Sequence, residues 1–113
     1  MLLRGVESMD SINDFIFTLQ KCREEKLLDN AHLSHHHICR WGLETHESLG
    51  NFLVPLFVDC GSIYDARRVF GKLSFRTEHS WTSLIQGYVD HGELNIVLKL
   101  YERMREENVH PNP

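Results

Sequence analysis

Hydrophobic residues recur with helical spacing in the last third of the chain. The intervals i, i+3, i+4 and i+7 occur twice there and predict two amphipathic helices. Between the two series, Asp90-His91-Gly92 predicts a turn, with Gly92 suited to the left-handed conformation that ends a helix. The two apolar series are Trp81, Leu84, Ile85 and Tyr88, then Leu94, Val97, Leu98, Tyr101 and Met104.

A similar pattern stands earlier in the chain. Residues 59–70 read DCGSIYDARRVF, and residues 90–101 read DHGELNIVLKLY. The middle copy therefore predicts the same hairpin, with Ser62 and Asp65 able to cap its second helix. Its apolar positions are Leu53 and Phe57 on the first helix, then Ile63, Ala66, Phe70 and Leu73 on the second.

A weaker copy comes first. Ser11 and Asp14 are expected to open a helix through Leu19, and a second helix is expected over about residues 27–41. The predicted boundaries are an extension at 1–11, then repeats at 12–46, 47–77 and 78–112.

A helical hairpin of this size cannot bury its apolar stripe alone, so neighbouring hairpins must stack. The predicted fold is all-α, a right-handed superhelical solenoid of three hairpins. Phe70 and Tyr101 share one position of the repeat, where His35 stands in the first copy, and both rings are expected to be buried between hairpins.

The amino-acid sequences of the three copies resemble one family of helical repeats. Residues 80–112, SWTSLIQGYVDHGELNIVLKLYERMREENVHPN, resemble the pentatricopeptide repeat throughout. LGNFLVPLFVDCGSIYDARRVFGKL is similar to the short variant of that repeat, and TLQKC with HHHICRWGLE to the long variant. The order long, short, standard is similar to that of plant organelle members with mixed repeat lengths.

The resemblance implies that each repeat binds about one base of single-stranded RNA through two or three side chains. It places the readers early on each first helix and at the last residue of the repeat, with a wedge residue beside them. A Thr with a closing Asn would prefer adenine. Ile16 cannot hydrogen-bond a base, so the first repeat is expected to recognise little. The implied pairs are Thr82 with Asn112, Asn51 with Thr77, and Ile16 with His46, and the wedges are His79, Ser48 and Asn13.

The resemblance also implies a location in the mitochondrion or chloroplast, and a role in RNA processing or editing alongside other RNA-processing proteins. No cofactor and no small-molecule substrate are expected. The sequence has no Gly-rich phosphate loop and no His-Glu-x-x-His motif, and the deaminase-like tail of some family members is missing, so we expect no enzyme. Three repeats would recognise about three bases, too few to find one transcript, so we expect part of a longer array.

Composition limits the class of protein and the compartment in which it is expected. Hydrophobic residues make up 42% and charged residues 25%, which are ordinary globular values. No run of 18 apolar residues is present, so no membrane partner is expected. The three cysteines lack C-x-x-C spacing, which favours a reducing compartment, and MLLRGVESMD acquires acids too early for a typical transit peptide.

Charge argues against nucleic acid. The 12 basic and 16 acidic residues give a net charge of −4, although the stretches 48–58 and 79–89 contain no charged residue. Glu24, Asp59 and Asp90 stand where the family often has a Lys that approaches a phosphate, which predicts weaker binding. A scaffold that binds peptides therefore stays open as the alternative function.

Two further features bear on the site. Pro55 lacks the N–H that would bond the carbonyl of Asn51, and we expect a kink in the helix that carries this reader. The segment HLSHHHIC has helical i, i+3, i+4 and i+7 spacing that would suit zinc. The repeat register places His35 inward and its neighbours elsewhere, so no metal site is expected. The four candidate ligands are His32, His35, His36 and Cys39.

Overall fold

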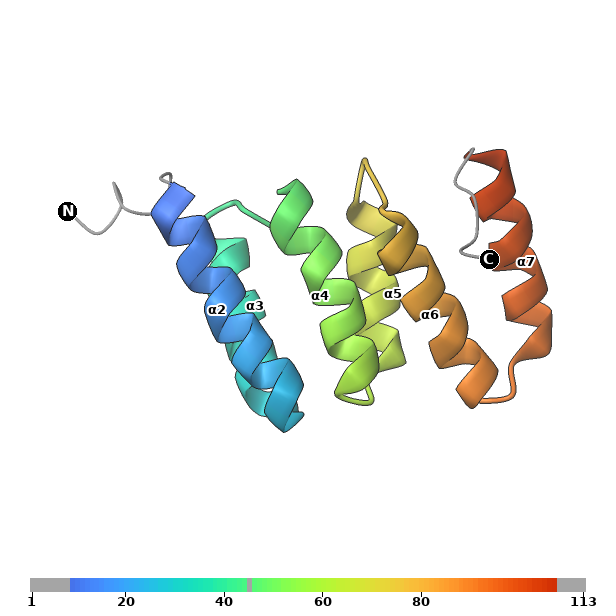
Figure 1. The fold of residues 1–113 in the computed structure, drawn as a ribbon, viewed down its shortest axis with the longest axis horizontal. Coiled ribbons are helices and arrows are strands. Elements are labelled where there is room, and N and C mark those ends of the chain that lie inside the picture. The colour runs from blue at the N-terminus through green and yellow to red at the C-terminus, as the bar shows by residue number, and fades with distance from the viewer. Residues whose placement is uncertain (1–8, 45, 108–113) are drawn as a thin grey trace.

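The computed structural model describes residues 9–44 and 46–107, which form six α-helices and no strand (Figure 1). The first hairpin pairs α2 (Met9–Glu25) with α3 (Leu28–Arg40), and the second pairs α4 (Glu47–Asp59) with α5 (Ile63–Lys72). The third pairs α6 (Glu78–Asp90) with α7 (Leu94–Glu106). These elements confirm the all-α prediction of stacked helical hairpins, while the exact repeat boundaries stay a prediction.

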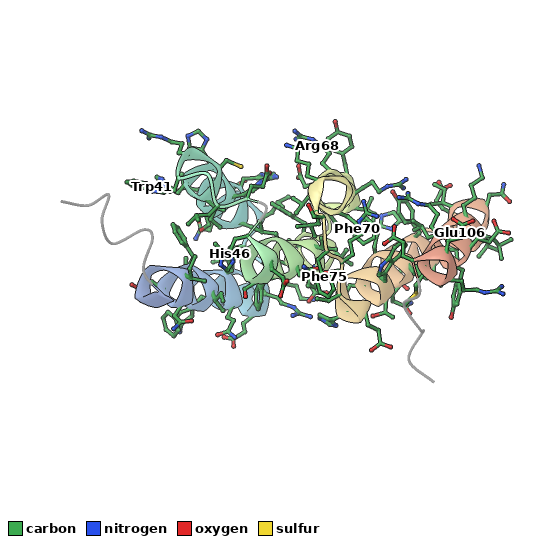
Figure 2. All side chains as sticks on the ribbon, turned by 90° about the horizontal axis from the view of Figure 1, so that it is seen from above. Trp41, His46, Arg68, Phe70, Phe75 and Glu106 are labelled. Atoms are coloured by element: carbon green, nitrogen blue, oxygen red, sulfur yellow. The ribbon has the colours of Figure 1, made fainter. Side chains whose placement is uncertain are left out.

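The helices form two layers, seen from above in Figure 2. The first helices α2, α4 and α6 lie side by side, because α4 packs against both of the others. Each of α3 and α5 packs against its own first helix and against the first helix of the next hairpin. The array is elongated, with extents of 48 × 28 × 22 Å, so one layer presents a continuous surface of first helices.

Three glycines end helices in the left-handed conformation, as predicted for Gly92. Gly42, Gly61 and Gly92 have φ values of 72°, 88° and 76°, which L-residues with a side chain rarely adopt. Gly61 and Gly92 lie in the turn between the two helices of a hairpin. In the first hairpin the same turn, between α2 and α3, contains Lys26 with φ 54°. The repeated Gly in the sequence thus marks a repeated turn.

The helix starts differ in detail from the prediction. The first helix begins at Met9 and not at Ser11. Ser62 is the N-cap of α5 as expected, but its side chain makes no bond to the helix backbone. Its hydroxyl instead donates to the Asp65 carboxylate, at 2.5 Å. Pro55 does not end its helix, since α4 runs from Glu47 to Asp59.

The core lies between the two layers, and its largest fully buried side chains are Trp81, Phe57 and Phe70. Phe70 is 1% exposed and meets Trp81 of the next hairpin edge-on, with ring centroids 4.7 Å apart, which confirms its predicted burial. The prediction for Tyr101 is wrong, because this ring is 42% exposed. The helix that carries it, α7, packs against α6 only among the described helices.

A search of the described residues finds no helix long and apolar enough to cross a membrane.

Candidate nucleic-acid interface

An open groove runs between α4 and α6 on the layer of first helices. Residues of α6 form one wall, residues at the end of α4 form the other, and Lys26 reaches it from the turn after α2. Hydroxyl, amide, carboxylate and ammonium groups all face this groove, so it offers both hydrogen bonds and charge to a polar ligand. Its polar lining consists of Lys26, Asp59, Thr82, Ser83, Gln86 and Asp90.

A second groove lies beside it, between α2 and α4. Phe52 contributes an aromatic face to this groove, and Arg23 contributes a guanidinium. Aromatic rings and guanidinium planes are the groups on which single-stranded bases stack. The two grooves share Asp59, so together they form one path across the three first helices.

The predicted reader of the third repeat lies in this path. Thr82 is half-buried on α6, and its hydroxyl donates to the His79 carbonyl oxygen at 3.2 Å. The predicted wedge His79 is exposed on α6, one turn before Thr82. Asn112, the closing partner of Thr82, lies outside the described residues.

The predicted residues of the first repeat are divided between α2 and the start of α4. Asn13 is exposed on α2, and Ile16 is half-buried there. His46 is the N-cap of α4, where its Nδ1 accepts the backbone N–H of Ser48 at 3.2 Å. Ser48, the predicted wedge of the second repeat, is exposed. His46 therefore has a local capping role that exists without any ligand.

Asn51 and Thr77, the predicted pair of the second repeat, do lie together, but inside the molecule. Asn51 is only 7% exposed. Its Oδ1 accepts the backbone N–H of Thr77 at 3.0 Å. Thr77 is also the N-cap of α6, and its hydroxyl oxygen accepts the N–H of Ser80 at 3.2 Å. These two side chains connect the second hairpin to the third.

The acids at the ends of the first helices are partly compensated. Asp59, which lines both grooves, accepts a hydrogen bond from Arg23 Nε at 2.5 Å, and the guanidinium offsets its negative charge. Gln86 donates to Asp90 at 2.9 Å without neutralising it. Glu24 lines the second groove and is exposed. The predicted repulsion of phosphates is therefore weaker at Asp59 than the sequence suggested.

The histidine segment divides between two partners. His35 Nε2 lies 2.6 Å from the Glu44 carboxylate, and His32 lies 2.6 Å from Asp65. Among the described residues, the donor atoms of His35, Cys39 and Glu44 come within 4.8 Å of one another, a set that shares two members with the predicted quartet.

The chemistry of this trio opposes metal binding in its present form. Partial desolvation and the neighbouring Glu44 carboxylate raise the pKa of the Cys39 thiol to about 11, so the thiolate that zinc requires is scarce at neutral pH. Burial alone would raise the pKa of Glu44, but hydrogen bonds from His35, Cys39 and Lys72 lower it. The carboxylate is thus already held by other groups, and the absence of a metal stays a prediction.

Sequence reasoning missed three residues of this region. Ser80 was not singled out, although it is fully buried and bonded to Asn51. Arg76 lies over the Phe70 ring at 4.6 Å and pairs with Glu107 at 2.7 Å. Lys26 lines the main groove. Of these three residues, only Lys26 could have been noticed in the sequence, because it occupies the turn position where the other two repeats have Gly.

Comparisons with known proteins give a consistent result. Residues 76–113 match the PPR repeat family. A pentatricopeptide repeat-containing protein of Arabidopsis thaliana is 34% identical over 99 residues, which cover 88% of this chain and 20% of that protein. Another from the same plant, named as chloroplastic, is 38% identical over 78 residues, or 69% of this chain and 9% of the relative. A third, named as mitochondrial, is 34% identical over 94 residues, or 83% of this chain and 15% of the relative.

Residues 76–113 thus match the PPR repeat family, and the chain as a whole is similar to pentatricopeptide repeat-containing proteins. The chain spans about a fifth or less of the length of these relatives.

Proposed function

We propose that this chain is a module that binds single-stranded RNA in a sequence-specific way, within an organellar RNA-processing or editing factor. Proteins built from this repeat recognise about one base per repeat. The observation that carries the proposal is the position of Thr82, half-buried in the groove between α4 and α6 at the place where the repeat holds its base reader. The relatives named as chloroplastic and mitochondrial support an organellar location.

The third repeat would recognise adenine. The Thr82 hydroxyl now donates to a backbone carbonyl, and a small rotation lets it donate to a ring nitrogen of the base instead. The amide of Asn112 both donates and accepts, as the edge of adenine requires. His79, one turn earlier on the same helix, would lie against the base as the wedge. Lys26 in the same groove would meet a phosphate.

The order of a long, a short and a standard repeat supports assignment to the subclass with mixed repeat lengths found in plant organelles. The same assignment leaves chemistry to other parts of the assembly, so the proposed role of this chain is binding without catalysis. Other RNA-processing proteins are its proposed partners.

The base preference is tested by grafting residues 78–112 into a longer array, because three repeats alone bind too few bases for a strong signal. RNAs that differ only at the facing base are compared at one stated salt concentration. We expect adenine to bind best, and the double change Thr82→Asn with Asn112→Asp to move the preference to uracil. Equal affinity for all four bases in both versions would contradict the proposal.

A protein-binding scaffold is the second candidate, and one observation favours it. Leu94, Leu98 and Tyr101 follow one another on α7 at helical spacing and are 62%, 65% and 42% exposed. Apolar capture of a peptide depends little on salt, whereas RNA binding weakens steeply as salt is added. A salt series on the bound ligand therefore separates the two functions.

A further inference from the structure

The Asn51 side chain is saturated by hydrogen bonds, although it stands where the repeat would place a base reader. Its Nδ2 donates to the carbonyl oxygens of Glu47 at 3.0 Å and Phe75 at 2.9 Å. Its Oδ1 accepts the Thr77 N–H at 3.0 Å and the Ser80 hydroxyl at 2.8 Å. A carboxamide offers two N–H donors and two lone pairs, and all four are in use. A base could bond this amide only by displacing partners that are already there.

Pro55 adds a second reason for this arrangement. In a regular helix the N–H of residue 55 would bond the carbonyl of Asn51, and proline has no N–H. The Ser80 hydroxyl lies 3.0 Å from that freed carbonyl oxygen and is itself fully buried. Its one proton can serve both the carbonyl and Oδ1 of Asn51. Ser80 thus replaces, from the next hairpin, the hydrogen bond that Pro55 removes.

These groups come from three parts of the chain. Asn51 and Pro55 lie on α4, Phe75 lies in the connection to the third hairpin, and Ser80 lies on α6. Figure 2 shows Phe75 beside the layer of first helices, where this connection passes. Every hydrogen bond from Asn51 to Phe75, Thr77 or Ser80 therefore ties the second hairpin to the third.

We propose that Asn51 is the polar joint between the second and third hairpins, positioned by Ser80 at the carbonyl that Pro55 leaves free, and that it does not contact RNA. The second half of this statement rests on the proposed RNA-binding function, and the first half does not. The second repeat then acts as a spacer, and base recognition in this part of the array belongs to the third repeat.

Hydrogen-bond energies favour the present partners of Asn51 over a base. Breaking two or more buried hydrogen bonds leaves polar groups without partners, and each such group costs about 1–3 kcal/mol. A new bond to a base returns about the same as one of the bonds lost. Thr82 differs in this respect, because it is half-buried in the groove and gives up only a bond at the exposed surface.

The joint is tested without RNA on the full chain by thermal unfolding of Asn51→Asp. The change puts a carboxylate oxygen opposite the carbonyls of Glu47 and Phe75, where an N–H now donates. We expect Tm to fall by about 5–15 °C. The matched control is Asn95→Asp at the exposed start of α7, which should stay within about 3 °C of the parent. A Tm for Asn51→Asp as high as that of the control would overturn the joint.

The role of Ser80 is tested by a double-mutant cycle with Pro55. Ser80→Ala should lower Tm clearly in the parent chain. Pro55→Ala restores an N–H to the Asn51 carbonyl, so the loss caused by Ser80→Ala should be about half as large in that background. Ser34→Ala, at a half-buried serine on α3, is the control in both backgrounds and should change Tm equally in each. An equal loss from Ser80→Ala in both backgrounds would show that Ser80 does not serve that carbonyl.

The RNA half is tested by NMR on the same full chain with a large excess of short oligouridine that carries one adenine, because chemical shifts also report the weak binding expected of three repeats. We expect the Thr82 backbone signal to shift while the side-chain NH₂ signals of Asn51 stay in place and slow to exchange. Movement or rapid exchange of the Asn51 signals on addition of RNA would overturn the proposal. If neither residue responds, the proposed RNA binding fails, and the melting experiments still decide the joint.

Discussion

The second helices of the last two hairpins carry the same sequence pattern and differ in what covers them. Phe70 on α5 is 1% exposed, whereas Tyr101 at the same repeat position on α7 is 42% exposed. Ile63 is half-buried, and its counterpart Leu94 is 62% exposed. The cause is the next hairpin: α5 packs against α6, while α7 meets only α6 of its own hairpin among the described helices. The position in the repeat thus predicts which side chains can be buried, and the presence of a following hairpin decides whether they are buried.

The first hairpin gives a third version of this position. His35 stands in place of the ring, with a side chain 17% exposed. It meets the Phe57 ring edge-on at 5.5 Å, and its Nε2 lies 2.6 Å from Glu44. The next hairpin therefore covers an imidazole in part, and the Glu44 carboxylate gives it a polar partner, which an all-carbon ring would not need.

The largest expected effect separates the two rings. Phe70→Ala should destabilise the chain by about 3–5 kcal/mol, because it empties a fully buried site against Trp81. Tyr101→Ala should cost less than about 1 kcal/mol, because that ring lies largely in solvent. Urea unfolding of both variants measures the difference. Similar losses would mean that the two helices are covered alike.

A smaller effect is expected at Gly87, where α6 lies close to the second hairpin. A Cβ on Gly87 of α6 would lie 2.6 Å from Ile63 Cδ1 and 3.2 Å from Val58 Cγ1. Overpacking of this kind costs about 1–3 kcal/mol, and the better helix propensity of Ala returns about 1 kcal/mol. Gly87→Ala should therefore destabilise by about 1 kcal/mol in the same urea assay.

Gly71→Ala is the matched control for this change. Gly71 also lies in a helix, but a Cβ added there would meet no neighbouring atom within 4 Å, so only the propensity gain of up to about 1 kcal/mol should remain. The two substitutions should move stability in opposite directions. Stabilisation by both substitutions would show that α6 packs against Ile63 and Val58 more loosely than the structure indicates.

The smallest effect is expected from zinc, which should leave the Tm unchanged. His35 and Glu44 are bonded to each other, and Lys72 Nζ lies 3.3 Å from the same carboxylate. The Cys39 thiol, with a pKa of about 11, would also have to lose a proton. Calorimetric melting with and without one equivalent of zinc checks this. A large upward shift that Cys39→Ser abolishes would establish a metal site at the first hairpin.

Much of the fold could be predicted from the sequence because its signals are local. Apolar spacing placed the helices to within a few residues, and Gly92 marked a turn with positive φ. Phe70 was predicted correctly because helical spacing and the repeat register agree there. The groove residue Thr82 followed from the same register, since a repeat places equivalent residues on equivalent surfaces.

Only the tertiary structure decided the contacts between hairpins. Tyr101 and Phe70 look alike in sequence, and burial depends on the neighbouring hairpin, which the spacing within one helix does not encode. Asn51 and Ser80 are polar residues that sequence alone assigns to the surface, yet Pro55 frees a carbonyl and the next helix brings a hydroxyl to it. Hydrogen bonds between distant segments depend on where packing places their atoms, so the polar joint of this array became visible only once the helices were stacked.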